Sequence, residues 1–263
     1  MKVVKLELYR AFHGKTFYIS LLIGLIICTL DLLSFCAQFG VNDGEYLIQA
    51  WIGTDYQFAY NEMFYVLLPV LACLPFGGSL YMDKITGYAK NICIKASRNN
   101  YIFAKCISVF LSAFCSVAIP IGLNLFIAAG LFPNFIPERL EWMSIGLLDR
   151  NMFSSIYSIN PVLYCLIYIL IDGFFSGSIA LTSLSIAKIV NSHFSAVVTP
   201  MVLVIITSII TEGDSLSNWS VLGMMNPRQY VTTLWYQMIT IFFLILLVNV
   251  FIIVRCTRKQ DIL

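Results

Sequence analysis

The side chains with the most evident chemistry lie in one basic stretch, DKITGYAKNICIKASRNNYIFAK at 83–105, between two long apolar runs. It carries five Lys and Arg against a single acid, although only 11% of the chain is charged. On a helix over 84–98, apolar and polar side chains fall on different faces. The candidate docking residues on and around the polar face are Lys84, Lys90, Asn91, Ile94, Lys95 and Arg98.

Ile94 breaks that pattern, because it is an apolar residue among polar ones. An exposed apolar side chain on a basic face indicates a contact with another protein. Taken alone, the same helix is more typical of an interfacial segment that only organises a loop.

Two acids, Asp31 and Asp172, lie inside apolar runs. An ionisable group at the centre of a membrane costs roughly 2.5–3.5 kcal/mol on insertion scales, so neither should face lipid. Each is either a polar contact for a cationic substrate or a structural acid, and Ser176 is a candidate partner for Asp172. The spacing Gly173-x-x-x-Gly177 favours close helix packing.

Metal and catalytic chemistry find little support in the sequence. The only histidines, His13 and His193, are isolated, and the eight cysteines are scattered without metal-ligand spacing. No H-E-x-x-H and no close pair of acids occurs. We therefore expect no metal, no catalytic residue and no nucleic-acid partner, and a membrane-embedded enzyme is disfavoured.

The elements that carry these residues are predicted to be membrane helices. The chain is 59% hydrophobic, and soluble domains carry about a quarter charged residues. We predict one all-α membrane domain over 1–263. It should begin with an amphipathic interfacial helix over 1–15, followed by a bend at Gly14. The bases of this helix, Lys2, Lys5 and Arg10, should face anionic lipid, or the segment is only a positive-inside anchor. Six spans should follow, at about 17–35, 63–82, 106–132, 161–187, 195–211 and 237–254.

The distribution of charge predicts how these spans are oriented. Of the 16 Lys and Arg, 13 fall on the side of the two termini and the loop at 83–105. Basic loops stay in the cytoplasm, so both termini should be cytoplasmic. An even number of spans requires the same arrangement.

The basic loop and this topology resemble the membrane subunits of ABC-2 type exporters, which have the type V architecture. The family pattern in this loop is an acid, a Gly, a Lys, Ser-Arg and a Lys that opens the third span. Here these are Asp83, Gly87, Lys90, Ser97-Arg98 and Lys105. The sequence departs from the pattern at Tyr88, where Thr is usual, and at Lys95-Ala96, where Pro is often found.

The resemblance implies a coupling helix at 84–98 that docks a separate nucleotide-binding ABC ATPase subunit, present in two copies. ATP and Mg would bind that subunit, because this chain has no G-x-x-x-x-G-K-[ST] and should bind no cofactor. A second six-span permease subunit, identical or paralogous, would complete the pathway in the bacterial plasma membrane. The resemblance to lantibiotic or bacitracin-type peptide exporters implies that the cargo is an antimicrobial peptide, a drug or another amphipathic substrate.

The resemblance also implies where a substrate would pass. Spans two and five would line the pathway, and its candidate residues are Asp172, Thr199, Thr207 and Ser208. The external segment 211–237 would form a lid with Trp219, Met224, Met225 and Trp235, or these side chains would form an interfacial aromatic belt. Two alternatives stay open: a substrate-binding membrane module of an energy-coupling uptake system, and a secondary transporter.

Overall fold

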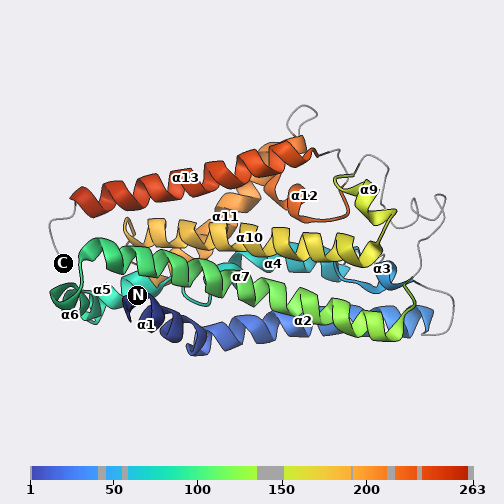
Figure 1. The fold of residues 1–263 in the computed structure, drawn as a ribbon, viewed down its shortest axis with the longest axis horizontal. Coiled ribbons are helices and arrows are strands. Elements are labelled where there is room, and N and C mark those ends of the chain that lie inside the picture. The colour runs from blue at the N-terminus through green and yellow to red at the C-terminus, as the bar shows by residue number, and fades with distance from the viewer. Residues whose placement is uncertain are drawn as a thin grey trace.

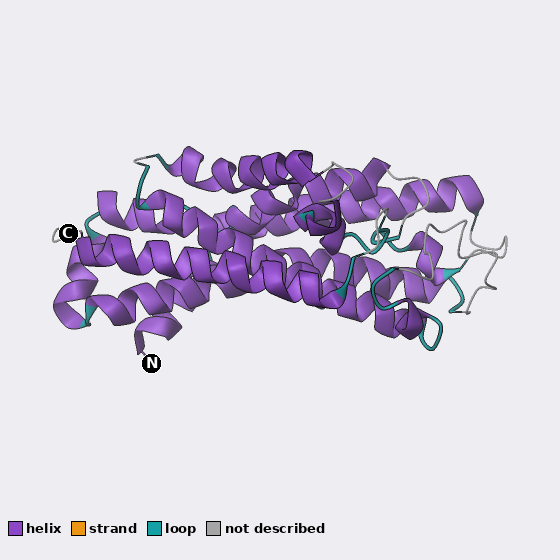
Figure 2. Cartoon of the chain, turned by 90° about the horizontal axis from the view of Figure 1, so that it is seen from above, coloured by secondary structure: helices purple, strands orange, loops and turns teal. Residues whose placement is uncertain are grey.

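The computed structural model describes residues 2–40, 46–54, 59–134, 151–190, 192–211, 217–229 and 233–259, and the elements in these ranges are all helical. Long helices run side by side along one axis (Figures 1 and 2). The elements are α1 Lys2–Phe12, α2 Lys15–Phe39, α3 Leu47–Ala50, α4 Ala59–Cys73, α5 Ser79–Ile85, α6 Tyr88–Lys95, α7 Arg98–Leu131, α9 Ser154–Tyr157, α10 Pro161–Ala187, α11 His193–Thr211, η1 Ser217–Trp219, α12 Val221–Met225 and α13 Trp235–Lys259.

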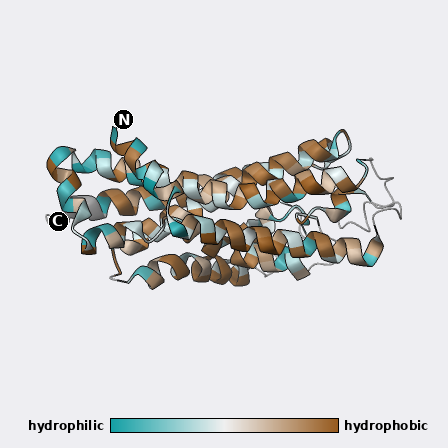
Figure 3. Cartoon of the chain, turned by 90° about the horizontal axis from the view of Figure 1, so that it is seen from below, coloured by the Kyte–Doolittle hydropathy of each residue, from teal (hydrophilic) through white to brown (hydrophobic). Residues whose placement is uncertain are grey.

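Five helices are long and apolar enough to cross a membrane, namely α2, α7, α10, α11 and α13. Apolar residues dominate the middle of the bundle, whereas hydrophilic ones gather at the end that holds α1, α5 and α6 (Figure 3). The prediction of an all-helical membrane chain is thereby confirmed. We call this end the α6 end, and the opposite end, which holds α3 and α9, the α3 end (Figure 1).

The predicted second span, 63–82, is not one helix. Helix α4 ends at Cys73 after 15 residues, about 22 Å, which is short of the roughly 30 Å of a bilayer core. The cause is Pro75, which has no N–H to offer the carbonyl of Leu71 four residues earlier. The hydroxyls of Ser20 and Ser116 donate to that carbonyl instead, at 2.6 and 3.2 Å.

The turn after α4 is held by close approach to its neighbours. A Cβ added at Gly77 would collide with the side chain of Ser183 in α10, and one added at Gly78 would collide with the ring of His193. Thr16, at the start of α2, donates to the carbonyl of Pro75 at 2.7 Å. The turn is therefore anchored to three helices, and α5 continues from it to the α6 end.

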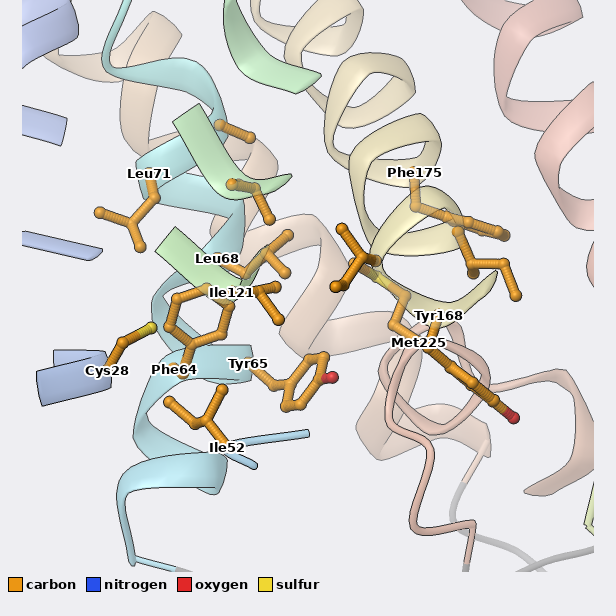
Figure 4. Packing of buried hydrophobic residues seen from close by; sticks show 14 of the residues in the cluster. Cys28, Ile52, Phe64, Tyr65, Leu68, Leu71, Ile121, Tyr168, Phe175 and Met225 are labelled. Carbon is orange, nitrogen blue, oxygen red and sulfur yellow. The ribbon is translucent and has the colours of Figure 1, made fainter. Parts of the chain in front are cut away.

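Helix α10 is the centre of the bundle and is mostly buried along its length. Gly173 and Gly177 bring it against α7, where the rings of Phe114 and Phe110 occupy the space that a Cβ would need. On another side, the ring of Tyr65 reaches from α4 toward α10 (Figure 4). The apolar core therefore lies between α4, α7 and α10.

A buried non-spanning segment at the α3 end was not foreseen, because the sequence indicated only an external loop over 36–62. Residues 47–54 form α3 and a following turn, and Trp51 and Ile52 are almost completely buried. The turn's backbone groups bond to side chains. Asn124 accepts from the N–H of Ile52 at 3.0 Å, and Asn61 donates to its carbonyl at 2.6 Å. Buried backbone groups outside a regular helix are unfavourable unless other protein groups bond to them, as these two asparagines do.

Candidate functional site

The basic stretch forms two short helices and the start of a third, rather than the single helix expected over 84–98. Gly87 separates α5 from α6 and has φ 71°, a left-handed conformation that suits glycine. Ser97 then caps α7, and its hydroxyl accepts from the N–H of Asn100 at 3.4 Å. Lys84 therefore belongs to α5, and Arg98 is the first residue of α7.

Helix α6 presents a mixed basic and apolar surface away from the bundle. Ala89 is buried beneath it, whereas the side chain of Ile94 is 82% exposed. The exposed residues, which we call the α6 surface, are Lys90, Asn91, Ile94 and Lys95. Their spacing places them along one side of the helix. Lys84 is exposed on α5, and Arg98 is half-buried.

Four charged side chains meet beneath this surface, and we call Glu7, Arg10, Asp83 and Lys105 the charge cluster. Arg10 donates to Glu7 at 3.0 Å and to Asp83 at 2.7 Å. The ammonium of Lys105 donates to Glu7 at 2.8 Å and to Asp83 at 2.5 Å. Each cation thus bridges both acids, and the cluster joins α1, α5 and α7.

Aromatic side chains enclose the charge cluster. The guanidinium of Arg10 lies 3.8 Å from the ring centroid of Tyr88, and the ammonium of Lys105 lies 4.3 Å from that of Phe76. Cations at such distances are attracted by the ring quadrupole. The hydroxyl of Tyr88 also donates to Glu7 at 2.9 Å. Because Tyr88 is the first residue of α6, this helix is tied to the cluster as well.

The electrostatics of the cluster favour the charged form of Asp83. Burial alone would raise the pKa of Asp83, but hydrogen bonds from Arg10 and the charge of Lys105 outweigh it and lower that pKa below its usual range. Burial and the bond to Glu7 raise the pKa of Tyr88 to about 12. Two acids and two bases cancel, so the cluster is formally neutral; Glu7, Asp83 and Lys105 are buried, and Arg10 is partly exposed.

This cluster corrects the expected orientation of α1. The helix was predicted to turn its basic side, including Arg10, toward lipid headgroups. Arg10 instead points into the bundle, and Glu7 is fully buried. Lys2 and Lys5 remain exposed as expected. The available signal was Glu7, the only acid of α1, one helical turn before Arg10.

Asp172 lies deep in α10 and is fully buried, and its partner is not the expected one. Tyr65 of α4 donates to its Oδ2 at 3.1 Å. Ser176, which the sequence suggested, donates to the carbonyl of Gly173 at 2.7 Å instead. The other oxygen, Oδ1, has no hydrogen-bond partner among the described residues.

A cavity of about 280 Å³ lies near the α3 end between α4, α11 and α12. Ser208 lines it, and so does Tyr65, the partner of Asp172. Thr199 and Thr207 bond to carbonyls of their own helix, Ser195 and Val204, and are not among the described residues that line the cavity. Of the four pathway candidates, the structure therefore places one at the cavity and a second, Asp172, directly behind it.

The four residues expected to form a lid lie in different environments. Met224 and Met225 of α12 are fully buried, and Met225 packs into the core beside Tyr168 (Figure 4). Trp219 is 38% exposed and Trp235 is 59% exposed. The methionines thus belong to the packed core, and the two indoles lie on the surface.

Comparison with known proteins returns no family model, no curated protein and no solved structure that matches the chain. Within the described residues, no three His, Cys, Asp or Glu side chains are placed to hold a metal ion. Function is therefore inferred from the geometry of the α6 surface, the charge cluster beneath it and the cavity near the α3 end.

Proposed function

We propose that this chain is the membrane subunit of an ATP-driven ABC exporter in the bacterial plasma membrane, with both termini in the cytoplasm. A separate nucleotide-binding subunit, in two copies, would bind ATP and Mg and dock on the α6 surface. A second six-span permease subunit, identical or paralogous, would complete the pathway. The observation that most supports this proposal is the exposure of Ile94. This apolar side chain is 82% exposed and lies between exposed lysines on α6, which Tyr88 connects to the charge cluster.

The charge cluster gives this surface a mechanical connection to the spans. A force on α6 reaches Glu7 through Tyr88 and reaches Lys105 of α7 through Glu7. Helix α7 has 34 residues and runs for about 50 Å along the bundle. Displacement of α6 would therefore move α7 and α1 together, as rigid-body motion.

An even number of crossings, as both cytoplasmic termini require, needs a sixth beside the five long helices. In this proposal the predicted span over 63–82, which comprises most of α4 and the start of α5, supplies it. The chain enters α4 near the α3 end and leaves α5 at the α6 end (Figure 1). The turn at Pro75 interrupts this crossing close to the α6 end. There, two hydroxyls of α2 donate to backbone carbonyls: that of Thr16 to Pro75 and that of Ser20 to Leu71.

For the cargo we propose an amphipathic molecule, such as an antimicrobial peptide, exported from the cell or from the membrane. Helices α4 and α11 pack against each other, and the cavity between them includes the pathway candidate Ser208. The proposed route runs beside this cavity and past the polar pair of Tyr65 and Asp172.

The test is purification of the tagged full chain from its native membrane, followed by assay of co-purifying, vanadate-sensitive ATP hydrolysis. Ile94→Asp and the pair Lys90→Glu with Lys95→Glu should abolish co-purification while leaving the amount of inserted chain unchanged. Lys2→Glu with Lys5→Glu is the matched control, because these lysines are exposed at the same end on another helix.

If the Ile94→Asp variant and the Lys90→Glu/Lys95→Glu variant both still co-purify with the ATPase subunit, α6 is not its docking site. Co-purification with a second kind of membrane subunit that carries its own ATPase would instead favour an energy-coupling uptake module. Transport by the isolated chain without any ATPase would favour a secondary transporter.

A further inference from the structure

We propose that Asp172 is a proton-binding site and that its proton exchanges with the cavity near the α3 end through the hydroxyl of Tyr65. Asp172 lies near the middle of α10 and is fully buried. Tyr65 of α4 donates to its Oδ2 at 3.1 Å. Among the described residues this is the only hydrogen bond of the carboxyl, because Oδ1 has no partner there.

The surroundings of this carboxyl offer it no positive charge in the described part of the chain. No Lys or Arg there forms an ion pair with Asp172. The ring of Phe114, from α7, lies against the next residue of α10. The titratable side chains around the pair of Tyr65 and Asp172 are Cys28, Tyr164 and Tyr168. Thiols and phenols carry no positive charge in either protonation state.

An acid in such a place favours the neutral, protonated form. Removing an ionised carboxylate from water is strongly unfavourable, and a buried acid without a cation takes up a proton instead. Asp83 of the charge cluster differs, because Arg10 and Lys105 both donate to it. Asp172 has a single neutral donor, so a proton is what balances its charge.

A proton is also the ligand that fits the available space. Asp172 is not among the described residues that line the cavity, so a larger cation there would not touch its carboxyl. Tyr65 lines the cavity and bonds to Asp172 as well. Its ring reaches from α4 toward α10 (Figure 4). Tyr65 therefore connects the cavity to the buried acid.

The size and lining of the cavity suit water, which can supply the proton. The cavity encloses about 280 Å³, and one water molecule occupies about 30 Å³ in the liquid. Polar side chains line it, among them Glu62, Ser208 and Asn226. Water in the cavity would therefore find hydrogen-bond partners beside Tyr65.

Proton uptake at this pair is a relay between two oxygens. A protonated water in the cavity gives its proton to the oxygen of Tyr65, while the original hydroxyl proton of Tyr65 moves to Oδ2 of Asp172. One O–H bond forms on the carboxyl, one breaks on the water, and Tyr65 stays neutral. The separation of 3.1 Å is within the range over which hydrogen-bonded groups transfer protons. The relay needs no ATPase subunit, so this inference stands or fails separately from the exporter proposal.

The experiment uses the full chain in lipid nanodiscs and infrared spectroscopy, which detects the C=O stretch of a protonated carboxyl. Near neutral pH the wild-type chain should show a band that is missing from Asp172→Asn. Asp31→Asn, which changes a buried acid of α2, is the matched control and should retain that band. If Asp172→Asn does not give a monodisperse chain, Asp172→Glu, which keeps the carboxyl, should shift the band instead of removing it.

The route through Tyr65 is tested by the exchange of this proton for deuterium. Transfer of the wild-type chain into D2O should lower the frequency of the band. Tyr65→Phe, which keeps the ring but removes the hydroxyl, should retain the band and slow its exchange about tenfold or more. Tyr168→Phe is the matched control, because the hydroxyl of Tyr168 donates to the carbonyl of Met152 at 3.3 Å instead. Its exchange rate should equal that of the wild type.

Three results would overturn the proposal. A wild-type spectrum without a band that depends on residue 172 would show that Asp172 is ionised. A band that does not shift in D2O would make Asp172 a sealed structural acid without access to the cavity. Equal exchange rates in the wild type and in a monodisperse Tyr65→Phe chain would show that the proton reaches Asp172 by another route.

Discussion

The two ends of the bundle hold their non-spanning segments by different chemistry. At the α6 end, four charged side chains join α1, α5 and α7, and all but Arg10 are buried. At the α3 end, neutral amides hold the buried turn after α3: Asn124 and Asn61 bond to its backbone, and Asn226 bonds to Asn61. Both ends bury polar groups, but the buried ion pairs of Lys105 with Glu7 and Asp83 lie at the α6 end.

The difference matters for how each end can move. Removing one member of a buried ion pair costs about 3–5 kcal/mol, because its partner is left charged in an apolar place. A neutral hydrogen bond contributes only about 1 kcal/mol net. The α6 end should therefore move as one body, whereas the amide contacts of the α3 end can exchange one at a time. This difference is compatible with the proposed exporter, in which a docked ATPase subunit would displace the α6 end while contacts at the α3 end rearrange.

The largest effect on the difference between the two ends is expected from Lys105→Met, which removes a cation of the charge cluster. The side chain of Lys105 is 1% exposed, and without it Glu7 and Asp83 are buried with too little positive charge. We expect a loss of about 3–5 kcal/mol of stability. Thermal unfolding of the purified chain in detergent measures it. Lys95→Met, at an exposed position of α6, should change the midpoint little.

A second substitution separates charge from packing at the same place. Adding Asp83→Asn to Lys105→Met removes the excess negative charge, so part of the lost stability should return. If the double variant is as unstable as the sum of the single ones, packing of the lysine chain and not charge holds the α6 end.

The corresponding change at the α3 end is Asn124→Leu, which keeps the number and branching of the side-chain heavy atoms but removes the acceptor for the N–H of Ile52. Asn124 also donates to the carbonyl of Cys28 at 2.9 Å, so it joins the turn to α2. A buried N–H left without a partner costs about 1–3 kcal/mol. Hydrogen exchange at Ile52 should accelerate, while exchange near Lys105 stays slow. Equal acceleration at both ends would mean that the bundle responds as one unit. Asn99→Leu, exposed at the start of α7, is the control.

The length of the apolar runs predicted the long helices well, because apolar runs of about 20 residues have few alternatives. Helix α10 occupies the predicted 161–187 to the residue, and α11 extends the predicted 195–211 by two residues at its start. The gathering of bases at one end also followed from the loops alone. These features depend on local composition, which a single chain displays directly.

The parts that sequence reasoning missed all depend on contacts between distant residues. The break after α4 needs Ser20 and Ser116 to replace the N–H that Pro75 lacks. The charge cluster joins residues 98 positions apart, Glu7 and Lys105. Composition cannot reveal such pairs. Of the candidate residues, those on α6 are exposed as the pattern suggested, whereas Met224 and Met225 lie in the core because α12 folds back against α10 and α11.

A smaller effect is expected at the joint between α5 and α6. Gly87→Ala places a side chain at φ 71°, where an added Cβ meets no neighbour within 4 Å. The cost is therefore backbone strain alone, about 1–2 kcal/mol. Gly122→Ala is the matched control, since its Cβ also meets nothing and its helical backbone suits alanine. Thermal midpoints should fall for the first variant and stay level or rise for the second.

The smallest effect, and the one that most directly distinguishes the ends, is the response to acid. The pKa of Asp83 is lowered in the folded chain relative to its ordinary value of 3.8, so the folded state binds fewer protons than the unfolded state near that pH. The stability that Asp83 contributes is thus fully present above that value and is lost as the pH falls through the lowered pKa. We expect a level stability between about pH 7 and 5, then a decline below pH 4 that Asp83→Asn reduces. The amides at the α3 end do not titrate, so the protection of the Ile52 N–H, which is its exchange rate relative to the intrinsic rate at the same pH, should not change until the cluster itself opens. A decline in stability that starts near neutral pH and persists in Asp83→Asn would show that another group causes the acid response and that the charge cluster does not.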